Sequence, residues 1–203
     1  MYVPEVFRIE DLELIRHLVD TNPFATVVTT VDGELEATPI PLHRVPTETG
    51  DVLLGHVARP NRLALGFGRP AVALFGGPHG YVSPAWYETS PNVPTWNYVA
   101  VHAHGVPEII EDEQELVSYL RELTRHFDPE LEATHPQTMG EDLIVSMLRG
   151  LIAFRMPVTQ WEAKAKLNQN KKPRDRHAVR DRYLDSERPE ERAMGALMAD
   201  LND

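Results

Sequence analysis

Residues 24–42 read FATVVTTVDGELEATPIPL, and this segment sets the expected fold class. Residues 25–31 are rich in Val and Thr, which favour strands. The pair Asp32-Gly33 follows, and Asp-Gly between two such runs is a strong signal for a two-residue β-hairpin loop. Residues 34–42 then return as the partner strand. Pro39 and Pro41 cannot donate to a ladder, so this strand is expected at an edge or an exposed rim.

Further β candidates follow at short spacing along the chain. They cover residues 51–57, 71–75, 80–83, 96–105 and 151–158. Helical patterns are predicted over residues 10–19, from Asp112 to Phe127 with Asp112 and Glu115 as a capping pair, over 142–149 and over 189–201. The strands are not separated by regular helices, which argues against a doubly wound parallel sheet. A β-rich α+β chain is expected, with a small antiparallel barrel and peripheral helices.

The length and composition fit one domain, residues 1–203, with a helical C-terminal segment at about 174–203. Cysteine is absent, so disulfides and thiolate metal ligands are unavailable. Neither a signal peptide nor an apolar run of about 20 residues is found, and a cytoplasmic location is expected. The net charge of −11 disfavours binding of a phosphate backbone, except through residues 162–182, which hold 8 basic and 3 acidic residues.

A first candidate anion site is the segment WEAKAKLNQNKKPRDR, residues 161–176. It places Lys164, Lys166, Asn168 and Asn170 at every second position after a predicted strand. In an extended chain these four side chains share one face, because strand side chains alternate. Two cations and two amides would suit a small anion such as a phosphate. The alternative interpretation is a solvated basic loop.

A second candidate is GHVARPN, residues 55–61, at the end of a predicted core strand. The guanidinium of Arg59 suits phosphate oxygens, and Asn61 can donate an amide hydrogen or cap the following turn. Arg59 could equally pair with one of the many carboxylates. Neither GxGxxG nor GxxxxGK[ST] occurs, so the two best-known phosphate loops are missing.

A third candidate is VPTWNY, residues 93–98, in which Trp96 and Asn97 combine a flat apolar surface with a donor and an acceptor. This combination suits a planar heterocycle, although core or interface aromatics are the more common outcome. His102 and His104 share a strand face, but no third ligand stands at a recognisable spacing, so no metal site is predicted. His79 fits a catalytic role or a turn equally well.

The segments NPFATVVTT, GHVARPN, GPHGYVSPAWY, VPTWNYVAVHAHG and KAKLNQNKKPRDR occur in this order. Together they resemble the PaiB family of FMN-binding negative transcriptional regulators, over nearly the whole chain. The resemblance implies a split β-barrel related to pyridoxamine-phosphate oxidases, a homodimer, and FMN in the groove between the subunits. The residues that it implies for binding FMN are Thr38, Ile40, His56, Arg59, Asn61, Trp96, Asn97, Lys166, Gln169 and Asn170.

Within this set, His56, Arg59 and Asn61 would lie near the phosphate. Thr38 and Ile40 would lie beside the isoalloxazine. Trp96 and Asn97 would line the groove, and Lys166, Gln169 and Asn170 would close it, from the same or the other subunit.

One departure from the oxidases concerns the phosphate site. Where they have a Ser-Arg-Lys run, this chain has Ala58-Arg59-Pro60-Asn61, so one local cation is missing. Either Lys166 or Arg62 replaces it, or FMN binds weakly, because a partly desolvated phosphate needs paired donors. The substrate-binding motif of the oxidases is absent as well, so their specific activity is not implied.

Three functions remain open at the level of sequence. The first is a dimeric, flavin-binding regulator. Its acidic composition argues against direct binding to DNA, which is left open. The second is a flavin-dependent oxidoreductase that uses a nicotinamide nucleotide or another small molecule, with His56, His79 or Tyr81 near the flavin. The third is a haem-binding protein in which His102 or His56 would be the axial ligand.

Overall fold

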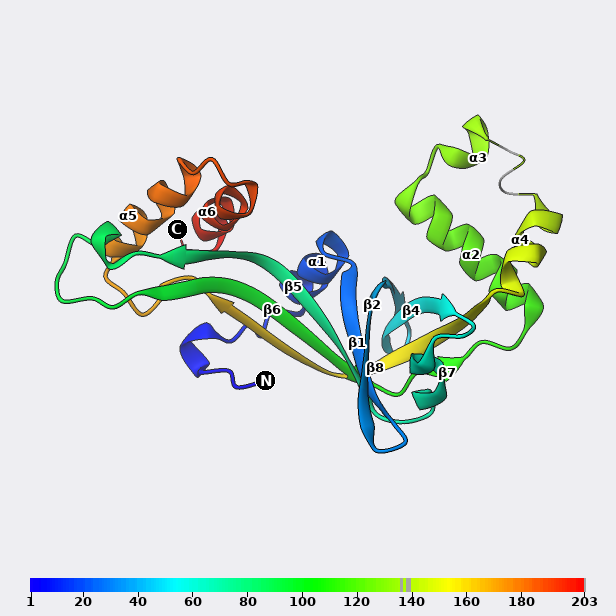
Figure 1. Ribbon diagram of the computed structural model, residues 1–203. Helices are drawn as coiled ribbons and strands as arrows, with labels where there is room; N and C mark the ends of the chain where they lie inside the picture. The colour runs from blue at the N-terminus through cyan, green and yellow to red at the C-terminus, as the bar shows by residue number, and fades with distance from the viewer. Residues whose placement is uncertain (136, 138–139, 203) are drawn as a thin grey trace. The chain divides into compact units, whose positions relative to one another are not determined.

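The computed structural model describes residues 1–135, 137 and 140–202, and its centre is an eight-stranded sheet (Figure 1). The strand order is β2-β1-β5-β6-β8-β4-β3, and β7 pairs with β8. The strands are β1 (Phe24–Val31), β2 (Glu34–Pro41), β3 (His43–Thr47), β4 (Gly50–Ala58), β5 (Ala71–Val82), β6 (Thr95–Gly105), β7 (Glu108–Ile109) and β8 (Leu151–Lys166). The α-helices are α1 (Leu12–Thr21), α2 (Glu113–Phe127), α3 (Leu131–Thr134), α4 (Glu141–Leu148), α5 (Pro173–Leu184) and α6 (Pro189–Asn202).

Short 3-10 helices complete the architecture: η1 (Glu5–Phe7), η2 (Arg62–Gly66) and η3 (Pro84–Trp86). Contacts divide the chain into two compact units. Unit 1 contains residues 1–22, 75–102 and 161–203, and unit 2 contains residues 23–74 and 103–160. Among the described residues, no helix has the length and apolar character needed to cross a membrane.

The predicted hairpin opens unit 2. Asp32 and Gly33 both have positive φ angles, of 53° and 84°, as a type I′ loop requires. Val31 pairs with Glu34, and the register continues to Phe24 opposite Pro41. β2 is an edge strand of the sheet, so no neighbouring strand on its outer side needs a backbone N–H that its prolines lack. Both the hairpin and the edge position of its second strand are confirmed.

The core of unit 2 lies on one side of β4. Leu53 and Val57 are buried there, together with Phe154 of β8 and Leu42 after β2. Gly55 lies between them on the same side of the strand. A Cβ added at Gly55 would lie 2.6 Å from Cδ2 of Leu42 and 2.8 Å from Cζ of Phe154, so close packing requires glycine here.

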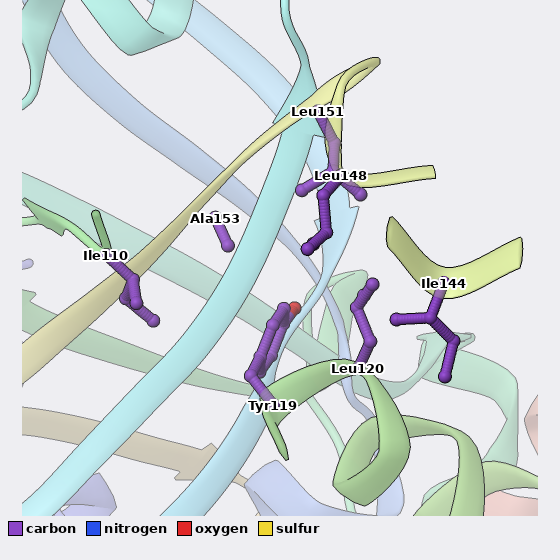
Figure 2. Packing of buried hydrophobic residues seen from close by; sticks show 7 residues of the cluster. All are labelled: Ile110, Tyr119, Leu120, Ile144, Leu148, Leu151 and Ala153. Atoms are coloured by element: carbon purple, nitrogen blue, oxygen red, sulfur yellow. The ribbon is translucent and has the colours of Figure 1, made fainter. Parts of the chain in front are cut away.

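The other side of β4 is covered by helices α2 and α4, also within unit 2. Asp112 caps α2, because its Oδ1 accepts a 2.8 Å hydrogen bond from the backbone N–H of Glu115, as the capping pair predicted. The helices and β8 share a buried apolar cluster with the segment before α2, and Figure 2 shows its side chains converging. This cluster consists of Ile110, Tyr119, Leu120, Ile144, Leu148, Leu151 and Ala153.

Unit 1 contains helices α5 and α6, which pack against each other (Figure 1). Val179 and Tyr183 of α5 are fully buried, as are Met194 and Met198 of α6. A buried carboxylate, Asp175, fixes α5 to the loop after η3. Its oxygens accept hydrogen bonds from the backbone N–H groups of Glu88 and Thr89, at 2.9 and 3.0 Å, and from the Thr89 hydroxyl at 2.6 Å.

The observed elements differ from the predicted ones in several places. The strands predicted at 71–75 and 80–83 form a single strand, β5 (Ala71–Val82), which continues through Gly76-Gly77-Pro78. β3 was not predicted. α5, which has many charged residues and little apolar periodicity, was expected only as part of a helical C-terminal segment at about 174–203, without its own bounds. β8 extends to Lys166, eight residues beyond the predicted strand end at Val158.

Candidate functional site

The ends of β2 and β4 bring Thr38 and Asn61 together in unit 2. Oδ1 of Asn61 accepts a 2.9 Å bond from the backbone N–H of Leu63, so Asn61 caps η2 as predicted. The same oxygen accepts a 3.3 Å bond from the Thr38 hydroxyl. The side-chain nitrogen of Asn61 has no partner in the part of the chain that the structure describes. Two amide N–H donors are therefore free to meet an anion.

Arg62 supplies a cation beside this pair. Its Nε lies 3.5 Å from Oε2 of Glu36, and its side chain is 56% exposed. Glu36 and Thr38 lie two positions apart on β2 and so share one strand face. The guanidinium thus lies near the pair of Thr38 and Asn61, while the Glu36 carboxylate partly offsets its charge. Arg62 was the alternative cation for the missing lysine of the oxidases.

Arg59 lies beside the C-terminal end of α4, where helix carbonyls lack partners within the helix. Its Nε donates to the carbonyl oxygen of Arg149 at 2.9 Å, and its Nη2 donates to those of Leu151 at 3.0 Å and Leu148 at 3.4 Å. These bonds leave Nη1 as the nitrogen available to a ligand. A phosphate contact by Arg59 stays a prediction.

His56 lies on the helix-covered side of β4. Its Nδ1 is 3.0 Å from the hydroxyl oxygen of Tyr119 in α2. Burial lowers the pKa of His56 below the ordinary value, so the imidazole is neutral at pH 7. The sequence did not identify Tyr119 as a partner, although its place on the apolar stripe of α2 would have been a usable signal. Flavin contact by His56 stays a prediction.

Ile40 has a buried side chain, 7% exposed, in register with Ala25 of β1. A contact with the isoalloxazine would therefore use its backbone, as the resemblance implied. That contact also stays a prediction. Trp96 of β6, in unit 1, is by contrast 53% exposed. Its ring lies 5.9 Å from that of Tyr81 and 6.4 Å from that of His79, so three aromatic rings form a partly open surface.

Asn97 is the next residue of β6 and is fully buried. Its Nδ2 donates weakly to Sδ of Met198 in α6 at 3.5 Å, and its Oδ1 is a buried acceptor with no partner among the described residues. Trp96 and Asn97 therefore point to opposite sides of the strand. In the structure, the Asn97 side chain lies next to α6. A ligand contact by this side chain stays a prediction.

Lys164 and Lys166 lie on one face at the end of β8, as predicted. The amine of Lys166 donates to the Thr95 hydroxyl. Burial lowers the pKa of Lys166, and the positive charge of Lys164 lowers it further, against an opposite effect of Tyr98. Lys164 is 7% exposed, and its amine lies 5.0 Å from the ring centre of Tyr98. Lys166 is the more accessible of the two cations.

The expectation that Asn168 and Asn170 share this face is wrong. Asn168 has a φ angle of 62°, a left-handed conformation that ends the alternation of the strand. Its side chain is 1% exposed, and its Nδ2 donates to the Tyr87 hydroxyl at 3.4 Å. Gln169 bonds the local backbone, accepting from Leu167 at 2.7 Å and donating to Ala165 at 2.6 Å. Ligand contacts by Gln169 and by the exposed Asn170 stay predictions.

The free amide donors of Asn61 and the guanidinium of Arg62 are groups that can bind an anion. Comparison with known proteins gives the family of the chain. Residues 1–160 match the family described as "Putative FMN-binding domain". The chain is 34% identical over 206 residues to "Protease synthase and sporulation protein PAI 2" of Bacillus subtilis (strain 168), covering 98% of this chain and 97% of that protein.

Two solved structures resemble this fold. One is the flavocytochrome Anf3 from Azotobacter vinelandii, with a TM-score of 0.64 at 20% identity, covering 81% of this chain and 72% of the other. The second is an FAD- and haem-binding protein from Mycobacterium smegmatis, with a TM-score of 0.61 at 24% identity, covering 78% and 73%. The predicted split β-barrel with peripheral helices is confirmed. The chain belongs to the FMN-binding domain family, its cofactor is FMN, and its predicted resemblance to the PaiB family is confirmed.

Proposed function

We propose that this protein is a homodimeric FMN-binding regulator in which Asn61 and Arg62 hold the phosphate of FMN and Thr38 orients the Asn61 amide. The observation that carries the site is the acceptance of two hydrogen bonds by Oδ1 of Asn61, which turns its amide nitrogen outward as a free double donor. Arg62 adds the positive charge that a phosphate dianion needs when it leaves water. Bound FMN supplies electron or hydride transfer, and these residues orient it.

The second subunit is supported by an exposed apolar face on the β1–β2 hairpin. Phe24 is 67% exposed and Leu35 is 80% exposed. Pro41, Pro39 and Ala37 lie between them on the same face, because they pair with residues of β1 at alternate positions. A contiguous apolar face of this kind on a sheet is typical of an association surface. A second copy would cover it through an isologous contact.

The regulatory role is supported by the Bacillus subtilis relative, which is named as a sporulation protein. Because the net charge is −11, an effect on transcription through another protein or through the flavin fits better than direct binding to an operator. A gel-shift assay at low salt tests whether the protein binds an operator directly. The DNA is taken from upstream of genes whose expression changes when the gene for this protein is deleted. A cytoplasmic location is part of the proposal, and cell fractionation tests it.

The FMN site is tested by titration of apoprotein, with flavin fluorescence as the readout. Asn61→Asp keeps the oxygen that caps η2, removes both amide donors and adds a negative charge. We expect FMN affinity to fall at least about tenfold, which corresponds to about 1.4 kcal/mol, and the thermal midpoint to change little. Arg62→Ala should weaken FMN by a similar factor. Arg188→Ala is the matched control, because this arginine lies directly before α6 in unit 1 and is 77% exposed.

If Asn61→Asp and Arg62→Ala both bind FMN with wild-type affinity, the proposed phosphate site is wrong. The dimer is tested separately by sedimentation of Leu35→Glu. We expect a monomer, because a carboxylate on an apolar interface is costly to desolvate. A wild-type protein that sediments as a monomer at every concentration with FMN bound would remove the dimer from the proposal.

A second candidate function is a flavin-dependent oxidoreductase, and the partly open surface of His79, Tyr81 and Trp96 favours it. Exposed ring faces can stack on a nicotinamide or another planar substrate. Anaerobic mixing of the FMN-loaded protein with NADH or NADPH tests this. Bleaching of the flavin band within the mixing time supports catalysis, whereas a flavin that neither nucleotide reduces argues against it.

A further inference from the structure

Unit 2 contains a cavity of about 220 Å³ on the helix-covered side of β4. The residues proposed above to hold the phosphate are not among its described lining residues, although His56, which the family resemblance places near the phosphate, is one of them. Its lining residues are His56, Leu120, Leu123, Thr124, Leu131, Ile144 and Met147. Figure 2 shows Leu120 of α2 and Ile144 of α4 facing each other close to Tyr119. The wall is thus mainly aliphatic, with one imidazole.

The polar character of the cavity comes from His56. Its Nδ1 is occupied by the Tyr119 hydroxyl at 3.0 Å, and its Nε2 has no partner among the described residues. The hydroxyl of Thr124 already donates to the carbonyl of Leu120 at 2.8 Å. Burial also lowers the pKa of His56 and raises that of Tyr119, so the pair is neutral at pH 7. One neutral hydrogen-bonding atom is left for a ligand.

The direction of the bond between His56 and Tyr119 decides what Nε2 offers. If Tyr119 donates to Nδ1, then Nε2 carries the proton and donates. If Nδ1 donates, then Nε2 accepts. A hydroxyl group on the ligand satisfies both cases, because it can donate and accept. An amine cation or a carboxylate fits neither, since none of the lining residues that the structure describes is charged and an unpaired charge is costly to bury.

The volume limits the size of the ligand. Pockets that enclose a drug-sized molecule or a cofactor measure about 300–1,000 Å³, so this cavity is too small for FMN, a nicotinamide nucleotide or haem. An apolar protein cavity of about 150 Å³ is enough to hold benzene. We propose that this cavity binds a small neutral ring compound with one hydroxyl group, of the size of phenol, with the hydroxyl on His56 and the ring between α2 and α4.

The experiment uses the FMN-loaded full chain and three probes: phenol, toluene and benzoate. Titrations are followed by NMR, with the imidazole nitrogen signals of His56 as a local readout. We expect phenol to bind in the range of about 0.1–1 mM, toluene to bind at least threefold more weakly, and benzoate not to bind. Binding of phenol should shift the Nε2 signal of His56, and FMN absorbance should stay constant.

Two variants locate the binding. His56→Phe keeps a ring but removes Nε2, and should weaken phenol about tenfold while leaving toluene unchanged. Met147→Trp adds bulk at the rim, since Met147 is 51% exposed, and should weaken phenol and toluene alike. His17→Gln in α1 is the control. Absence of saturable phenol binding in the wild-type chain up to about 10 mM overturns the proposal, as does binding that both variants leave intact.

Discussion

Nη2 of Arg59 donates a 3.0 Å hydrogen bond to the carbonyl oxygen of Leu151. With the bond from Nε to Arg149, it ties the end of β4 to the segment between α4 and β8. Arg59 therefore has a structural role in unit 2, whether or not it also contacts a phosphate. The two roles predict different losses on mutation.

Arg59→Ala should lower the free energy of unfolding by about 1–2 kcal/mol, since it removes two short hydrogen bonds to backbone carbonyls. If the role is only structural, FMN affinity should change by less than about threefold at temperatures where the variant is folded. Chemical denaturation and FMN titration give the two numbers. A tenfold loss of FMN affinity with unchanged stability would instead support the phosphate contact implied by the family resemblance.

Asp175→Ala should destabilise the protein by about 3 kcal/mol, because three donors from Glu88 and Thr89 lose their acceptor in a buried place. Asp175→Asn keeps one oxygen and should cost less. Asp181→Asn, at an exposed position of the same helix, is the control. Equal denaturation midpoints for Asp175→Ala and the control would contradict this account.

The same carboxylate predicts part of the acid sensitivity. The hydrogen bond from the Thr89 side chain, supported by two backbone bonds, lowers the pKa of Asp175 in the folded state below its ordinary value of 3.8. Its contribution is thus complete above pH 3.8 and is lost as the pH falls through the lower, folded-state pKa. Unfolding curves of the wild type and of Asp175→Asn should converge in that acidic range. Curves of the two proteins that stay parallel in the acidic range would contradict a role of Asp175 in the acid sensitivity.

His56 predicts a second pH effect at milder acidity. Burial lowers its pKa below the ordinary 6.5, so the unfolded chain takes up the proton more readily than the folded one. Stability from this group is complete above pH 6.5 and is lost as the pH falls through the folded-state value. His56→Gln should flatten the dependence of the unfolding free energy on pH below 6.5. An unchanged slope in the variant would mean that other groups carry the effect.

Gly55→Ala should destabilise the protein by about 1–3 kcal/mol, because the new methyl group would overlap Leu42 and Phe154. Gly76→Ala is a matched control in β5, where a Cβ would meet no atom within 4 Å. Thermal unfolding of the two variants gives the comparison. Equal midpoints for both variants would show that Leu42 and Phe154 can move to accommodate the added methyl group.

The parts of the fold that follow from local chemistry were predictable. Asp32-Gly33 forms the turn of the β1–β2 hairpin, Asp112 caps the start of α2, and Asn61 caps η2. Each of these turns and caps joins residues at most three positions apart in the sequence. The bounds of α5 within the expected helical segment were not predicted, since its stability comes from a few buried contacts such as Tyr183 and not from an apolar stripe. Burial by tertiary partners overrides local propensity in such segments.

The site shows the same division. The cap at Asn61 could be predicted from its place before a turn. The bonds of Arg59 to carbonyls about 90 positions away have no local signature in the sequence. The left-handed residue Asn168 ended the alternation on which the four-residue anion face depended, and Asn is one of the residues that adopts this conformation most readily.

The alternation of β6 at Trp96 and Asn97 has a practical consequence. One residue is open to solvent, and its immediate neighbour is buried against Met198 of the C-terminal helix. A displacement of that helix would therefore reach the indole through a single peptide unit. Since Trp96 is one of three tryptophans, we expect part of the intrinsic fluorescence of this chain to report on the packing of its last helix.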